Sequence, residues 1–201
     1  SKIALVTGGS RGIGNAIVLD LLEKGYRVGV GYHNNKSMAQ EIAEKNSRAI
    51  PLNIDITSKK SIQKAFSEIE INFGTIDVLI NNAGISQVKS FELLEDEDWQ
   101  TMWETNFMSA VRCIKLALPA MIKKGGGRII NIASIGGQWG GVHQVHYAAS
   151  KAALINLTKS IAKSYSQEGI CCNAVSPGLI NTDMIADELK QSDSNLSLIH
   201  I

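Results

Sequence analysis

The sequence predicts an α/β fold in which helices cover both faces of a doubly wound parallel sheet. Short apolar segments with strand character alternate with segments of helical apolar spacing along most of the 201 residues. This alternation is typical of a parallel sheet, because neighbouring parallel strands need a helical crossover between them. A glycine-rich turn, Thr7–Gly14, also joins the first strand directly to the first helix. We therefore expect a single domain built around one sheet.

The expected elements follow one another without an internal repeat or a linker. The strands are expected at Ile3–Val6, Arg27–Tyr32, Ala49–Ile54, Asp77–Asn81, from Ile129 onward, and near Cys172–Ser176. The helices are expected from Asn15 onward and at Ser37–Lys45, Lys59–Phe73, Asp98–Lys123 and about Val145–Ser166. Three consecutive glycines, Gly125–Gly127, end the helix before them, because glycine is favoured just beyond a helix C-terminus.

The composition is that of a globular protein. Hydrophobic residues make up 44% of the chain, the mean hydropathy is +0.02 and the net charge is +1. This charge gives no general attraction to nucleic acid or to an anionic membrane, and no apolar run reaches the about 18–20 residues that a bilayer span needs. The first strand begins almost at once, which leaves no room for a signal peptide. The three cysteines form no metal-site pattern, so we expect a cytoplasmic protein with reduced thiols and no metal.

The turn Thr7–Gly14 has the features of a phosphate-binding site. Glycines let the backbone turn tightly and approach a pyrophosphate, while free N–H groups and the dipole of the following helix attract its charge. The turn is not followed by Gly-Lys and then Ser or Thr, which excludes a mononucleotide P-loop. Together with the alternating elements, the turn predicts a Rossmann-type dinucleotide-binding fold.

Tyr147 and Lys151 are four residues apart in an expected helix, so their side chains lie on one face. A free tyrosine has a pKa of about 10, and a nearby ammonium lowers it by favouring the phenolate. A pKa near 7 requires roughly 4 kcal/mol of differential stabilisation. One lysine in a partly dry cleft, together with a bound cofactor, can supply much of this. Taken alone, the spacing is common in helices for packing reasons, so its meaning depends on the rest of the chain.

Five motifs occur in the order of the short-chain dehydrogenase/reductase family. They are Thr7–Gly14 (TGGSRGIG), Asn81-Asn82-Ala83-Gly84, Ser134, Tyr147-x-x-x-Lys151 and Pro177-Gly178. The chain resembles this family from residue 7 to residue 178. The spacing between Ser134 and Tyr147 is similar too, and Asn106 falls where the family has a helix asparagine. Within the family, the segment Asn173–Met184 is similar to bacterial 3-oxoacyl-carrier-protein reductases.

The resemblance implies a reductase that passes a hydride from a nicotinamide cofactor to a substrate carbonyl, here a 3-oxoacyl thioester of fatty acid biosynthesis. Tyr147 would deliver the proton as general acid, and Ser134 would hydrogen-bond the carbonyl oxygen. Lys151 would lower the tyrosine pKa and hold the nicotinamide ribose, and Asn106 would support a water path. The residues expected to contact the cofactor are Gly8, Ser10, Arg11, Gly12, Ile13, Gly14, Asn34, Asp55, Ile56, Asn82, Ala83, Gly84, Tyr147, Lys151, Pro177, Gly178, Ile180 and Thr182.

The region after the second expected strand favours NADP(H) over NAD(H). An NAD-binding fold places an acid there, about 20 residues past the glycines, to bind the ribose 2′-hydroxyl. The segment Tyr32–Lys36 contains no acid, so nothing in it repels a 2′-phosphate. Arg11 supplies a cationic fork suited to phosphate, although it can also be read as a solvated turn residue.

Alternatives remain open at this point. The motifs do not separate a 3-oxoacyl reductase from a reductase or dehydrogenase of a sugar, polyol or small ketone, because specificity lies largely in the loops around Ile135–His146 and after Pro177. A dinucleotide-binding sensor without turnover is the alternative from another class, and the intact catalytic set argues against it. His143 and His146 lack a third ligand for zinc, so we expect them at the substrate mouth or in solvent.

The family commonly forms tetramers through the helices that here are Asp98–Lys123 and Val145–Ser166, so we expect a homotetramer or homodimer of the complete protein. The reductase domain is expected at residues 1–189, with a polar tail at 190–201. The last six residues match the translation of a common sequencing adapter. We therefore expect a C-terminally truncated domain with an artefactual tail, and hence aggregation, poor melting and little activity for residues 1–201.

Overall fold

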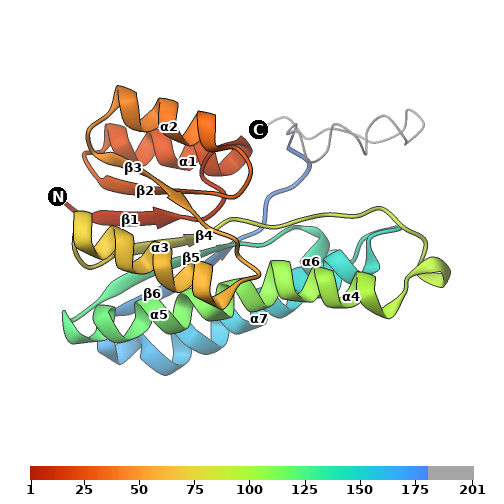
Figure 1. Ribbon diagram of the computed structural model, residues 1–201. Coiled ribbons are helices and arrows are strands. Elements are labelled where there is room, and N and C mark those ends of the chain that lie inside the picture. The colour runs from red at the N-terminus through yellow and green to blue at the C-terminus, as the bar shows by residue number, and fades with distance from the viewer. Residues whose placement is uncertain (181–201) are drawn as a thin grey trace.

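The computed structural model describes residues 1–180, and within them the strands form one six-stranded parallel sheet. The strands are β1 (Ile3–Val6), β2 (Arg27–Tyr32), β3 (Ala49–Asn53), β4 (Val78–Asn81), β5 (Gly127–Ile132) and β6 (Ile170–Val175). Their order is β3-β2-β1-β4-β5-β6, so the chain winds outward from β1 and then crosses back to β4 (Figure 1). This confirms the doubly wound α/β fold.

Helices cover both faces of the sheet (Figure 1). They are α1 (Gly12–Glu23), α2 (Lys36–Lys45), α3 (Lys59–Asn72), α4 (Asp96–Trp103), α5 (Ser109–Lys123), α6 (Gly136–Trp139) and α7 (Val145–Tyr165). Short 3-10 turns lie at Phe91–Leu93 and Ser166–Glu168, and a π-helical turn lies at Glu104–Met108. The helices α1 and α2 pack on one face, and α3, α5 and α7 pack on the other.

The alternation of side chains along each strand explains the two cores. In β1, Ile3 and Leu5 belong to the core under α3 and α5, whereas Ala4 and Val6 belong to the core under α1 and α2. Successive residues of a strand point to opposite faces. Because both faces are covered by helices, all four residues are buried, which accounts for the continuous apolar run in the sequence.

The expected helix Asp98–Lys123 is present and helical throughout, but its α-helical geometry is interrupted at one turn, which the sequence did not indicate. It begins earlier, at Asp96, and the π-helical turn Glu104–Met108 separates α4 from α5. The early start follows from its acidic first turn, because carboxylates stabilise a helix N-terminus, and Asp98 Oδ2 accepts a hydrogen bond from the Glu95 N–H at 2.9 Å. The π-helical turn does not alter the apolar spacing enough to be visible in the sequence, and such turns are frequent at functional sites.

The helix α1 begins in direct contact with the glycine-rich turn. A Cβ atom added to Gly14 would lie 2.1 Å from the Gly8 carbonyl oxygen and 2.5 Å from Asn82 Nδ2. Glycine is therefore required at residue 14 for close packing, although its own backbone is helical. Gly8 itself has φ of +63°, a conformation that favours glycine.

This contact leads to a stability prediction for Gly14→Ala. In most helices the change to alanine stabilises, but here the added methyl group clashes with backbone, so we expect a loss of roughly 1–3 kcal/mol. Thermal unfolding measures it, and the matched control is Asn15→Ala, the next residue of the same helix. A Gly14→Ala variant that melts at or above the wild-type temperature would contradict the close packing of α1.

Candidate active site

A cavity of about 690 Å³ opens at the carboxyl ends of the strands, where the strand order reverses between β1 and β4. Open α/β sheets bind their ligands at this place. The segments that line it follow β1 (Gly8, Ser10–Ile13), β2 (Tyr32–Asn35), β3 (Ile54–Thr57), β4 (Asn82–Ile85), β5 (Ile132–Ser134) and β6 (Pro177, Gly178, Ile180), with Thr101, Thr105, Tyr147 and Lys151 from the helical region. A cavity of this size fits an organic ligand.

Among the described residues, the structure brings all but two of the predicted site residues to this cavity. The two exceptions are Gly14, which packs behind the turn, and Asn106, which lies behind the segment that follows β4. Thr182, a predicted cofactor contact, lies outside the described residues. The same holds for the predicted tail at 190–201.

Side chains that bond to backbone groups connect the turns after β1 and β4. Thr7 Oγ1 accepts hydrogen bonds from the Asn82 and Ala83 N–H groups, both at 3.0 Å. Asn82 Nδ2 donates in return to the carbonyl oxygens of Thr7 at 3.0 Å and Gly8 at 3.1 Å. Two loops without regular structure are thereby held at fixed separation on the floor of the cavity.

Lys151 is buried at the end of the cavity with 5% of its surface exposed. Its Nζ donates to the Ile132 carbonyl oxygen at 2.8 Å, so the end of β5 orients the side chain. The same Nζ lies 5.8 Å from the centre of the Tyr147 ring. Burial disfavours the charged form and lowers the pKa of Lys151 to about 8. The lysine therefore remains mostly protonated at neutral pH, beside the tyrosine.

Ser134 and Tyr147 reach the cavity from two different elements. Ser134 follows the end of β5, and its Oγ accepts a hydrogen bond from the Gly136 N–H at 3.1 Å. Tyr147 lies in the first turn of α7 and is half-buried. Both residues line the cavity together with Lys151. The predicted catalytic trio is therefore assembled in one place.

Asn106 supports the cavity from behind. It is 2% exposed in the π-helical turn, and its Oδ1 accepts from the Ile85 N–H at 2.8 Å while its Nδ2 donates to the Ile85 carbonyl oxygen at 2.9 Å. The Nδ2 also lies 3.2 Å from Ser150 Oγ in α7. A Cβ atom at Gly84 would lie 2.9 Å from Asn106 Oδ1 and 3.5 Å from Lys151 Nζ, so glycine lets this segment pass between them.

Arg11 and Asp55 lie at the other end of the cavity. Arg11 is exposed at the N-cap of α1. Asp55 Oδ1 accepts from Thr57 Oγ1 at 2.7 Å and from the Thr57 N–H at 2.9 Å. The hydrogen bond from the Thr57 hydroxyl is the main reason why the pKa of Asp55 is lowered. Asp55 thus forms the turn after β3 as well as lining the cavity.

Sequence reasoning missed several residues that line the cavity, among them Thr57, Ile85, Thr101 and Thr105. Thr101 and Thr105 are four residues apart and precede Asn106, a spacing that places them on one helix face. The spacing shows that the two threonines share a helix face, but it does not show that this face borders the cavity.

Of the two histidines, only His146 departs from the expectation for them. His143 is exposed, whereas His146 is 1% exposed and bonded to Gln87, so His146 lies neither at the mouth of the cavity nor in solvent. Within residues 1–180, no group of three or more His, Cys, Asp or Glu side chains is placed to hold a metal ion. No helix in the same range is both long and apolar enough to cross a membrane.

Comparison of the sequence with known proteins identifies the family of the chain. The family profile described as short chain dehydrogenase matches residues 2–193. The chain is 38% identical to a 3-oxoacyl-(acyl-carrier-protein) reductase FabG of Staphylococcus aureus strain Mu50, over 95% of this chain and 80% of that protein. It is 42% identical to the protein of the same name from Escherichia coli strain K12, over 91% of this chain and 75% of that protein. The chain therefore belongs to the short-chain dehydrogenase/reductase family.

Proposed function

We propose that this oxidoreductase is an NADPH-dependent reductase of 3-oxoacyl thioesters, with Tyr147 as the general acid. The observation that carries the proposal is the buried ammonium of Lys151 beside the Tyr147 ring, in a cavity that continues to the glycine-rich turn. The name shared by the relatives from S. aureus and E. coli supports the substrate class.

The residues around the cavity fit a nicotinamide dinucleotide. The turn from Gly8 to Ile13 lines the cavity and leads into the N-terminus of α1, where backbone N–H groups and the helix dipole favour a pyrophosphate. Space for the rest of such a molecule remains open near Gly178, where an added Cβ would meet nothing within 4 Å. When bound, the dinucleotide supplies the hydride.

The chain's own residues would supply the proton and stabilise the developing charge. Tyr147 gives its phenolic proton to the carbonyl oxygen, and Ser134 donates a hydrogen bond to the same oxygen as negative charge grows on it. The Lys151 ammonium favours the phenolate that Tyr147 becomes, because the two groups are close and Lys151 is shielded from water. Asn106 fixes the segment at Ile85 that forms the wall next to these groups.

The test is NADPH oxidation with a panel of substrates, for the wild type and for Tyr147→Phe. We expect turnover with 3-oxoacyl thioesters and little with sugars, polyols or small ketones. In the Phe variant we expect a loss of roughly 10²–10⁴-fold, because only the general acid is removed, and unchanged NADPH binding. Wild-type turnover by the Phe variant would exclude Tyr147 as the acid, and turnover of sugars alone would exclude the thioester.

A second prediction concerns the pH dependence of stability that Lys151 imposes. Below pH 8 the folded protein carries a buried ammonium, whereas an unfolded lysine keeps its proton up to about 10.5. Between these values the unfolded state binds more protons, so this group makes the protein more stable as the pH rises. Relative to wild type, Lys151→Met should therefore lose about 3 kcal/mol of stability between pH 7 and pH 11.

Urea unfolding at several pH values measures this difference. The matched control is Lys159→Met, an exposed lysine two turns further along α7. Lys151→Met also loses the hydrogen bond to the Ile132 carbonyl oxygen. This loss lowers the stability equally at every pH, so it does not affect the change in the stability difference between pH 7 and pH 11. A Lys151→Met effect that stays constant from pH 7 to pH 11 would show that the ammonium is not desolvated.

A third prediction tests the choice of dinucleotide. Arg11→Ala should reduce the preference for NADPH over NADH by roughly 10- to 150-fold, the effect of losing a charge-assisted hydrogen bond. The ratio of kcat/KM for the two cofactors measures it. Arg48→Ala is the matched control, since Arg48 bonds to the Leu22 carbonyl oxygen, away from the residues that line the cavity. An unchanged ratio for Arg11→Ala would transfer the role to His33–Lys36.

A further inference from the structure

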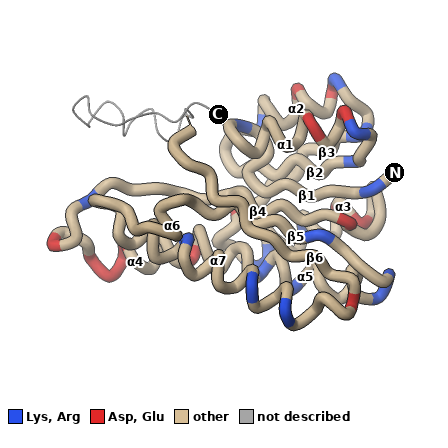
Figure 2. Tube along the Cα trace, turned by 180° about the vertical axis from the view of Figure 1, so that it is seen from behind, with Lys and Arg blue, Asp and Glu red and all other residues tan. Residues whose placement is uncertain are grey.

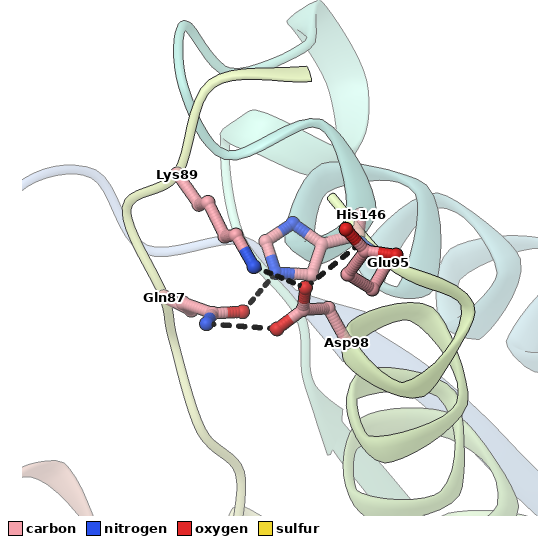
Figure 3. A network of polar contacts seen from close by, with 5 residues as sticks. All are labelled: Gln87, Lys89, Glu95, Asp98 and His146. Atoms are coloured by element: carbon pink, nitrogen blue, oxygen red, sulfur yellow. Dashed lines mark hydrogen bonds and ion pairs between the residues drawn. The ribbon is translucent and has the colours of Figure 1, made fainter. Parts of the chain in front are cut away.

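A network of polar contacts lies beside the turn that carries Tyr147 (Figure 3). It joins Gln87, Lys89, Glu95, Asp98 and His146, and its centre is the Asp98 carboxylate. Asp98 Oδ2 accepts from Lys89 Nζ at 2.6 Å and from the Glu95 N–H at 2.9 Å, and its Oδ1 accepts from Gln87 Nε2 at 3.0 Å. Figure 2 shows acidic positions, in red, at the start of α4, at one end of the molecule.

The network fixes the protonation pattern of the His146 ring. His146 Nε2 lies 2.8 Å from Gln87 Oε1. Because Gln87 uses its amide nitrogen for Asp98, the oxygen that faces His146 is an acceptor, so Nε2 must carry a hydrogen. The other ring nitrogen, Nδ1, is buried and has no hydrogen-bond partner within the described residues. The ring also contacts Trp99 edge-on at 5.9 Å. This environment suits a neutral imidazole.

Gln87 belongs to an extended segment, residues 85–89, that these contacts hold in place. The segment has no regular secondary structure and connects β4 to the turn at Phe91. Asn106 binds it at Ile85, and the Lys89 N–H donates to the His143 carbonyl oxygen at 2.8 Å. Ile85 lines the cavity. Hydrogen bonds therefore hold one end of the segment to the π-helical turn and the other end to the residues that lead into α7.

We propose that His146 is a positioning residue for the reduction: by donating from Nε2 to Gln87, it fixes the wall segment 85–89 relative to the helical turn that presents Tyr147. This rests on the proposed function, because it assigns a role in that reaction. The covalent link makes the coupling direct, since His146 immediately precedes Tyr147. One side chain therefore joins the turn that carries the general acid to the segment whose first residue, Ile85, lines the cavity.

The unpaired Nδ1 makes the position of the ring sensitive to acid. Because Nε2 keeps its hydrogen in either protonation state, acid acts by driving a charged ring out of its buried site, which breaks the contact with Gln87. A protonated ring would place a hydrogen on buried Nδ1, which has no acceptor among the described residues. Burial lowers the pKa of His146, the Asp98 carboxylate raises it and the Lys89 ammonium lowers it, with burial the largest effect. Two further titratable groups lie nearby: Glu95, which belongs to the network, and His143, which precedes α7. Activity should therefore fall as the pH drops below the ordinary histidine value of about 6.5.

Three variants test the proposal. His146→Phe keeps a ring against Trp99 but removes the donor. His146→Gln places an amide nitrogen at the position of Nε2 and cannot titrate near neutral pH. His143→Asn is the matched control, an exposed histidine three residues earlier whose φ of +55° asparagine tolerates. Each is measured for kcat and KM with a 3-oxoacyl thioester from pH 5 to pH 8, for NADPH binding, and for amide hydrogen exchange at residues 85–89.

We expect His146→Phe to lower kcat by roughly 5-fold or more, the effect of leaving a buried acceptor unpaired, with NADPH affinity unchanged. Exchange at Ile85 and Lys89 should become faster. His146→Gln should restore both the kcat and the slow exchange at Ile85 and Lys89, and its activity should not decline at low pH. His143→Asn should keep the wild-type pH dependence and the wild-type exchange at residues 85–89.

The proposal is overturned if His146→Phe keeps the wild-type kcat, even with faster exchange, since the residue would then be structural only. It is also overturned if His146→Gln shows the same decline in acid as wild type. Should His146→Phe fail to fold, Gln87→Met removes the same hydrogen bond from its other side. If the wild type reduces no 3-oxoacyl thioester, the proposed substrate is overturned instead. In that case the role of His146 is tested by hydrogen exchange alone, and unchanged exchange at residues 85–89 in both His146→Phe and Gln87→Met overturns it.

Discussion

The geometry of the site depends on one charge placed where water is nearly absent. The ammonium of Lys151 is 5% exposed, and burial alone lowers its pKa to about 8. Such a group is unfavourable for stability, because its desolvation is not fully repaid by one hydrogen bond. The same burial strengthens its field at the Tyr147 ring, because fewer waters screen it. The feature that costs stability is therefore the feature that the proposed proton transfer uses.

The lysine can sit there because a chain of polar side chains fixes α7 on the sheet. Asn131 in β5 accepts from Asn81 Nδ2 in β4 and donates to Thr158 Oγ1 in α7, both at 2.8 Å. This connects the neighbouring strands β4 and β5 with the helix, two turns beyond Lys151. Buried polar groups of this kind specify one arrangement of their elements, since any shift leaves them unpaired. The helix face that carries the site is set by these contacts as much as by apolar packing.

The sequence predicted the sheet well because each strand is an apolar run between turn residues, a local pattern. It predicted Ser134, Tyr147 and Lys151 at one site from the resemblance to the family, and from the spacing that places Tyr147 and Lys151 on one helix face. It did not predict the π-helical turn at Glu104–Met108, since the apolar spacing continues through it. Nor did it predict the burial of His146. That burial depends on Gln87, which bonds to His146, and on Asp98, which holds Gln87; both are distant from His146 in the sequence.

Buried polar groups in and behind the cavity explain why the fold and the geometry of the site are coupled. Lys151, Asn106 and His146 are all nearly excluded from water, and each bonds to a group from another segment: Ile132, Ile85 and Gln87 respectively. An unpaired buried polar group costs about 1–3 kcal/mol, a large part of the stability of a domain. Arrangements that separate these segments are therefore disfavoured by folding itself. The segment at Ile85–Lys89, Lys151 and the turn that carries Tyr147 are held together by hydrogen bonds between them and neighbouring segments, each of which pairs a buried polar group.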